Sequence, residues 1–107
     1  MADRVLKPQW FHILLALSGR DLHGYAIQRA VLAQTDQQLR LWPATLYRSL
    51  ERMEKAELIA QAGAPGCEPP DERRQYYSIT PVGRERLRDE AERMARWVAA
   101  VGVEGMS

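Results

Sequence analysis

The feature that most constrains this chain is a long helical segment near its C-terminal end, which begins at Thr80-Pro81 and runs to about Val101. Threonine is a favourable N-cap residue, and proline suits the first helical position. Apolar residues then recur with spacings of four, three, four and three; they are Leu87, Ala91, Met94, Val98 and Val101. A repeat of about 3.5 residues places them on one side of the helix and is typical of helix–helix packing. The fold must therefore supply this stripe with an apolar partner.

The remaining faces of this segment are charged, and we expect them to form a solvated belt. Its members are Arg84, Glu85, Arg88, Asp89, Glu92, Arg93 and Arg96. A chain of 107 residues has a small core, because a domain of this size buries only about 60–68% of its unfolded surface. A second copy could share the apolar stripe and stabilise it. The stripe is therefore the candidate dimer interface.

Three shorter helices are predicted upstream, at Pro8 to Leu17, Gly24 to about Ala33 and Pro43 to about Glu57. Proline stands at the start of the first and the third, where its missing N–H is not needed. The first helix is apolar almost all round, which is typical of a helix that is buried on every side. In so small a protein, part of that surface is expected to meet the partner's last helix, through Trp10 and Leu14.

Short strands are predicted between these helices. Leu39 to Trp42 alternates between apolar and polar residues and could form one strand. Leu58 to Ala62 and Arg74 to Ile79 are apolar or alternating, and the loop at 63–72 between them is rich in proline and glycine. Two strands joined by such a loop form a long hairpin.

The predicted order is helix, helix, strand, helix, strand, strand, helix (α-α-β-α-β-β-α). This is the plan of a winged helix-turn-helix, mainly α with a small β-hairpin and with a C-terminal dimerisation helix. Residues 1–79 would form the DNA-binding unit. Residues 80–107 would form the dimerisation helix, packed on that unit in one structural domain.

The third helix carries the candidate recognition surface. Residues at the N-terminal end of a recognition helix reach base edges, so they need to be small or polar. The candidate contacts on this helix are Pro43, Ala44, Thr45, Tyr47, Arg48 and Arg52. The alternative is that the arginines and Lys55 form a solvated face, with Glu51 and Glu54 as intrahelical partners. The net charge of +1 does not decide between the two, because it says nothing of where the charges lie.

The predicted hairpin supplies a second basic site. Arg73 and Arg74 stand where the loop meets its second strand, where a wing can lie against the DNA backbone. The alternative is a charge pair in a turn, balanced by the nearby acids Asp71 and Glu72. With Glu68, these acids would repel phosphate, so we expect the tip of the loop to point away from DNA.

Five segments of the chain follow a known pattern in order and at matching separations. They are Ile13-Leu14-Leu15, His23-Gly24-Tyr25-Ala26-Ile27, Pro43-Ala44-Thr45-Leu46-Tyr47, Leu50 to Ile59, and Arg73 to Gly83. Each is weak alone, but together they are specific. Over about residues 13–97 the chain resembles the PadR family of bacterial transcriptional regulators.

The resemblance implies a winged-helix homodimer that binds a palindromic operator on double-stranded DNA, usually as a repressor relieved by a ligand. His23 and Tyr25, in the second of these segments, are further candidate DNA contacts, with capping of the second helix as the alternative for His23. The chain departs from the family pattern in three respects. Ala44 replaces a glycine, Gln75 replaces a basic residue, and the C-terminal region is a single helix, as in the short branch of the family, with no separate ligand domain. The dimer is then expected to use the stripe from Leu87 to Val101.

A small aromatic effector is a further expected partner. Aromatic and methionine side chains at a dimer interface can line a flat apolar pocket, and Trp10, Met94 and Trp97 are the candidates here. The alternative is that these three side chains are plain interface core.

Other classes of function find little support. His12, His23 and Cys67 do not have the spacing of metal ligands, so we expect no metal and no cofactor. Cys67 is expected to be an ordinary thiol, with a redox switch as the alternative. No catalytic motif, signal sequence or membrane span is recognisable, so a cytoplasmic protein that is not an enzyme is expected. The main rival is a winged-helix module that binds proteins and not DNA.

Overall fold

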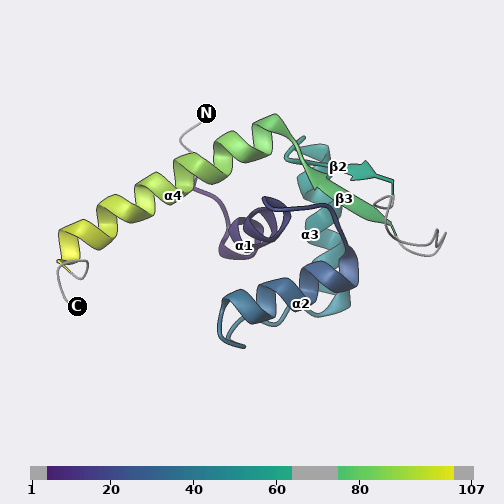
Figure 1. Cartoon of the computed structure of the whole chain (residues 1–107), viewed down its shortest axis with the longest axis horizontal. Coiled ribbons are helices and arrows are strands. Elements are labelled where there is room, and N and C mark those ends of the chain that lie inside the picture. The colour runs from purple at the N-terminus through teal and green to yellow at the C-terminus, as the bar shows by residue number, and fades with distance from the viewer. Residues whose placement is uncertain (1–4, 64–74, 103–107) are drawn as a thin grey trace.

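The described residues, 5–63 and 75–102, form four helices and a three-stranded antiparallel sheet in a computed structural model of the chain (Figure 1). In chain order the elements are α1 (Pro8–Leu17), β1 (Leu22–His23), α2 (Gly24–Gln34), α3 (Pro43–Lys55), β2 (Ile59–Ala62), β3 (Tyr76–Ile79) and α4 (Pro81–Val101). The mainly helical prediction with a small hairpin is confirmed, and all four helices occur within two residues of their predicted bounds.

The position of the first strand was predicted wrongly. Residues 39–42 are not a strand; β1 lies before α2 and pairs with β3, with Leu22 opposite Tyr77. The backbone at 39–42 forms hydrogen bonds with side chains of α2 and of the residue that follows it, instead of with a strand. Leu39 N donates to Thr35 Oγ1 at 3.0 Å, and Leu41 O accepts from Gln28 Nε2 at 2.6 Å. The alternating pattern arises because Leu39 and Leu41 point toward the core.

The core is formed by α1, α2, α3 and the start of β2. Its fully buried side chains include Ile13, Leu14, Leu17, Ile27, Val31, Leu46, Leu50, Met53, Leu58 and Ile59. Helix α1 lies at the centre of the fold, between α2 and α4 (Figure 1). The sheet has the order β1-β3-β2, so β3 is the central strand. It pairs with β2 to form the hairpin of the wing, and with β1, which directly precedes α2.

Helix α3 ends in a Schellman turn. Leu58 N donates to Met53 O at 3.0 Å, and Glu57 N donates to Glu54 O at 2.9 Å. This turn requires a left-handed residue at the position after the cap, and Glu57 occupies it with φ of 65°. Glycine adopts that conformation without the steric cost that a Cβ brings.

We therefore expect Glu57→Gly to raise the free energy of unfolding by about 0.5–1 kcal/mol. Glycine relieves the left-handed strain, and this gain is larger than the loss that comes from the greater entropy of glycine in the unfolded chain. Urea denaturation measures this change. Ala56→Gly is the matched control, because Ala56 has a right-handed φ of −82° and should lose stability when replaced by glycine. Equal losses in the two variants would contradict the argument.

Hydrogen bonds join the start of α4 to the turn that follows α3. Thr80 Oγ1 accepts from Gly83 N at 2.9 Å, which confirms the predicted N-cap, and it donates to Glu57 O at 2.6 Å. Thr80 N also donates to Leu58 O at 3.1 Å. Gly83 is buried against Leu58 and Ile79 in the first turn of the helix. These contacts set the direction in which α4 leaves the rest of the fold.

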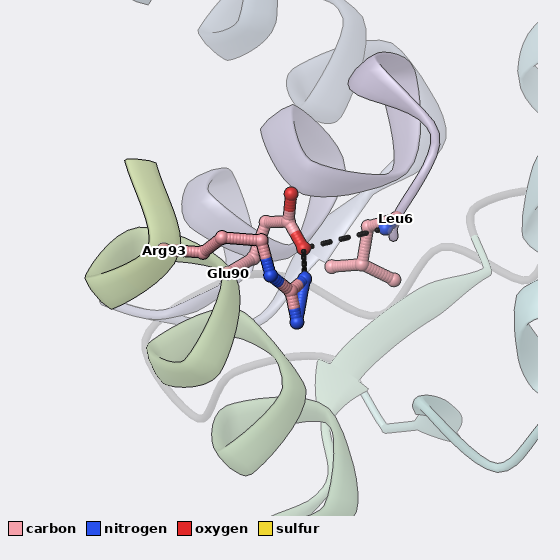
Figure 2. A network of polar contacts seen from close by, with 3 residues as sticks. All are labelled: Leu6, Glu90 and Arg93. Atoms are coloured by element: carbon pink, nitrogen blue, oxygen red, sulfur yellow. Dashed lines mark hydrogen bonds and ion pairs between the residues drawn. The ribbon is translucent and has the colours of Figure 1, made fainter. Parts of the chain in front are cut away.

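A hydrogen bond to a buried carboxylate joins α4 to the segment that precedes α1 (Figure 2). Glu90 is only 5% exposed, and its Oε1 accepts from Arg93 Nη1 at 2.8 Å and from Leu6 N at 3.4 Å. Arg93 was predicted to belong to a solvated belt and is instead half-buried, because the apolar Leu6 packs beside this face of α4. A buried carboxylate needs such partners.

The C-terminal half of α4 extends away from the other helices (Figure 1). On its predicted apolar stripe, Leu87 and Met94 are half-buried, whereas Ala91, Val98 and Val101 are exposed. Within the described part of the chain, no helix is long and apolar enough to cross a membrane.

Candidate nucleic-acid interface

The exposed surface of α3 is the side that faces away from the core. Leu46, Leu50 and Met53 are buried on one side of the helix, and the side opposite them reaches solvent. Pro43, Ala44 and Thr45 are all exposed, as are Arg48 and Arg52 one and two turns further on. The structure therefore brings the candidate contacts of this helix onto one open surface.

The first turn of α3 has no side-chain cap. Trp42 is the N-cap residue and makes no side-chain cap hydrogen bond, whereas His23 caps α2 and Thr80 caps α4. The N–H groups at a helix start carry the positive end of the helix dipole; here no cap side chain covers them, and Ala44 and Thr45 are exposed. This is the arrangement that suits a phosphate at the helix start.

The two arginines of α3 differ from Lys55 in their surroundings. Lys55 Nζ lies 3.9 Å from Glu51 Oε2 in an exposed pair, and Glu54 accepts a long hydrogen bond of 3.5 Å from Gln61. Among the described residues, neither Arg48 nor Arg52 is joined to an acid by an ion pair. Lys55 therefore has the intrahelical partner that the solvated-face alternative predicts, whereas the two exposed arginines have none among the described residues.

Tyr47 connects α3 to the start of α2. It is half exposed, and its ring and hydroxyl lie against Gly24, where any side chain would overlap them. Next to it, Tyr77 of β3 is buried; burial, with the charge of Glu54 and the neighbouring Tyr47, raises the pKa of Tyr77 above its ordinary value. Burial thus favours the neutral phenol of Tyr77, which lies on the strand that pairs with both β1 and β2.

His23 has a local structural role. Its Nδ1 accepts from Ala26 N at 3.2 Å, and its ring meets that of Tyr76 edge-on with centroids 5.3 Å apart. The capping alternative for His23 is thereby confirmed.

Tyr25, in the first turn of α2, is 61% exposed, and the guanidinium of Arg29 lies 5.8 Å from its ring centroid. Of the two, Tyr25 is the better placed to meet a ligand.

Helix α1 contributes less to a dimer interface than predicted. Leu14 is fully buried in the protomer's own core, so it has no surface left for a partner, and that prediction was wrong. Trp10 is half-buried beside a hollow of about 260 Å³. The residues that line the hollow are Val5, Leu6, Lys7, Trp10, Ala56, Leu58 and Arg86. Met94 and Trp97 do not line it, so one protomer does not bring the three effector candidates into this hollow.

Three candidates are not tested by the described residues. Arg73, Arg74 and Cys67 lie outside residues 5–63 and 75–102.

His12 is half-buried on α1, and its Nδ1 lies 3.2 Å from Gln34 Nε2; burial lowers the pKa of His12. Within the described ranges, no three His, Cys, Asp or Glu side chains gather as they would around a metal ion.

Sequence reasoning missed one exposed aromatic residue at this interface. Trp42 precedes α3 and is 64% exposed, and the guanidinium of Arg40 lies 5.5 Å from its ring centroid. The prediction of a strand at 39–42 hid it, because a strand residue next to a core is expected to be buried. The signal that could have found it is Pro43, which marks Trp42 as the N-cap of an exposed helix start.

Known proteins that resemble this chain are regulators of transcription. A model of the transcriptional regulator PadR-like family matches residues 13–89. A transcriptional regulator from Clostridium thermocellum is 26% identical, with a TM-score of 0.70 over 87% of this chain and 88% of that one. A PadR-like transcriptional regulator from Bacillus cereus has a TM-score of 0.72 at 23% identity, over 92% of this chain and 91% of that one. The predicted winged helix is confirmed by these folds.

A curated relative is much longer. An uncharacterized 37.1 kDa protein in a transposon of Streptomyces fradiae is 38% identical over 84 residues. The match covers 78% of this chain and 22% of that protein, so the chain spans about a fifth of the length of its relative.

Proposed function

Because the chain belongs to the PadR-like family of transcriptional regulators, we propose that it binds a palindromic DNA operator as a homodimer and represses transcription until a small ligand releases it. In this proposal α3 is the recognition helix. The observation that carries it is the exposed surface of α3, where an uncapped helix start stands beside Arg48 and Arg52 and their guanidinium groups are joined to no acid among the described residues.

The chemistry of that surface suits DNA. Thr45 has a hydroxyl that can donate to or accept from a base edge, and Ala44 is small enough to let the backbone approach the groove. Arg48 and Arg52 would bind phosphates or guanine edges and release counterions, which makes the affinity depend on salt. Arg73 and Arg74 would contact the backbone beside the groove as part of the wing.

A homodimer is supported by the apolar face of α4. Val98 and Val101 are exposed on the same stripe as Ala91, and the C-terminal half of α4 extends away from the other helices of the protomer (Figure 1). A two-fold axis along this face would cover the stripe and repeat α3 on the same side of the dimer. The recognition helices would then enter successive major grooves about 34 Å apart.

The effector site that we propose lies between the two copies of α4. Trp97 is 52% exposed and Met94 stands one turn before it. A flat aromatic molecule that bound between the helices would change the separation of the recognition helices and so weaken operator binding. A regulator of this kind acts on DNA in the cytoplasm, which is the compartment that we propose.

The decisive test is a salt titration of DNA binding. We expect the protein to shift a duplex from the region upstream of its own gene, and Arg48→Ala to weaken that binding about tenfold because a charge-assisted contact is lost. The slope of log K against log salt should fall by about 0.9 for each phosphate contact removed. Arg96→Ala is the matched control, because it removes the same charge from an exposed position of α4, far along the helix from α3.

Two results would contradict the proposal. If Arg48→Ala and Arg96→Ala bound DNA equally well at every salt concentration, Arg48 would not contact the operator. If the parent protein bound neither the upstream duplex nor any duplex from a randomised pool, the winged helix would serve as a protein-binding module and not as a DNA-binding one.

A further inference from the structure

Trp42 is the most exposed tryptophan in the described part of the chain. Its side chain is 64% exposed, against 52% for Trp97, whereas Trp10 is half-buried. Indole is the largest apolar side chain, and leaving it in water forgoes its burial. Trp97 lies on the proposed dimer face, so that exposure has an explanation. Trp42 lies instead at the start of α3, on the proposed DNA surface, so the proposed dimer face does not explain its exposure.

The backbone around Trp42 is held firmly although its side chain is exposed. Leu41, directly before it, is buried, and Leu41 O accepts from Gln28 Nε2 at 2.6 Å. Pro43, directly after it, has a restricted φ, and Trp42 O accepts from Leu46 N at 2.8 Å in the first turn of α3. The indole is therefore presented on a rigid support, which lowers the entropy lost when a partner binds.

Arg40 adds a positive charge to this position. Its guanidinium lies 5.5 Å from the centroid of the Trp42 ring, within the range of a cation–π contact. Both residues are exposed, and Arg40 is joined to no acid by an ion pair within residues 5–63 and 75–102. The pair thus places a flat apolar ring beside a cation at the start of the proposed recognition helix.

We propose that Trp42 and Arg40 form a DNA-contacting pair, in which the indole packs on the 5-methyl group of a thymine and the guanidinium binds the adjoining phosphate. This inference rests on the proposed function and adds a determinant of sequence specificity to it. Apolar side chains contact the thymine methyl in the major groove, and residues at the start of a recognition helix are those that reach base edges. A cation beside the indole favours a phosphate-rich partner over an apolar protein surface.

The test uses the full-length protein and a labelled duplex that the parent protein itself selects from a randomised pool. Each thymine of the protected site is replaced in turn by deoxyuridine, which removes only the 5-methyl group. We expect one replacement in each half-site to weaken binding by the parent. We expect Trp42→Ala to lose about tenfold in affinity for the unmodified duplex and to be insensitive to that same replacement. Trp42→Phe, which keeps an apolar ring, should retain the sensitivity.

The guanidinium is tested separately. Arg40→Ala should lower the salt slope by about 0.9, as expected for one phosphate contact, while it leaves the deoxyuridine sensitivity in place. Arg96→Ala should change neither. Far-UV circular dichroism and sedimentation check that each variant is folded and has the parent's oligomeric state.

The outcomes separate this inference from the function on which it rests. If the parent selects no duplex, the proposed DNA binding itself fails. If the parent binds and folded Trp42→Ala binds equally well, Trp42 does not contact DNA, and its exposure marks a protein-docking position instead. If Trp42→Ala loses affinity but no thymine replacement affects the parent, the indole does not read a methyl group, and the specificity role is overturned.

Discussion

Replacing Val98 with glutamate is expected to split the homodimer and to lower operator affinity by a hundredfold or more. Val98 is 43% exposed on the apolar face of α4, so the protomer tolerates a charge there. In the proposed dimer the same carboxylate would be buried without a partner, which is strongly unfavourable. Because two linked recognition helices bind far more tightly than one, loss of the dimer costs about 10²-fold or more in affinity for a two-fold site.

Sedimentation and a gel shift measure the two effects, and circular dichroism shows whether the monomer keeps its helices. The matched control is Ala99→Glu, because Ala99 is also exposed but lies about 100° further round the helix, away from the stripe. Met94→Glu should act like Val98→Glu. Leu87→Glu is a poorer probe, since Leu87 packs partly against the protomer's own core. An unchanged dimer for Val98→Glu would rule out α4 as the interface.

The second large effect is expected at Gly83. A Cβ at this position would overlap the backbone oxygen of Leu58 and crowd Ile79 Cγ1, which lies 2.9 Å from it. A backbone carbonyl that is bonded to Thr80 N cannot move aside easily. We expect Gly83→Ala to lower the free energy of unfolding by about 3 kcal/mol, the range of severe overpacking. The gain in helix propensity, about 1 kcal/mol, is too small to offset this loss.

Thermal unfolding checks this expectation, since a loss of that size lowers the Tm of a domain of this length by about 15 °C. Gly19→Ala is the control, because a Cβ there would meet nothing within 4 Å and its φ is not left-handed. If Gly83→Ala were as stable as the parent, α4 would not be seated on the turn after α3. The predicted direction of α4, and with it the proposed dimer, would then need revision.

The helices were predictable because their signals are local. Proline at the first turn of three helices and threonine as the N-cap of α4 act within a few residues of the backbone that they affect. The apolar face of α3 was predictable for the same reason, since the 3.6-residue period alone places Leu46, Leu50 and Met53 together. The exposed candidates of the recognition surface followed directly, as the residues left on the other side.

What the amino-acid sequence determined by itself is therefore the set of helices, the side of α3 that faces solvent and the apolar stripe of α4. Only the tertiary structure decided where the first strand lies, that Leu14 has no surface for a partner, and that Glu90 and Arg93 are sheltered from solvent. The physical reason is distance along the chain. Leu22 pairs with Tyr77 and Glu90 bonds to Leu6 N, and such remote partners leave no periodic pattern in the segments that they join.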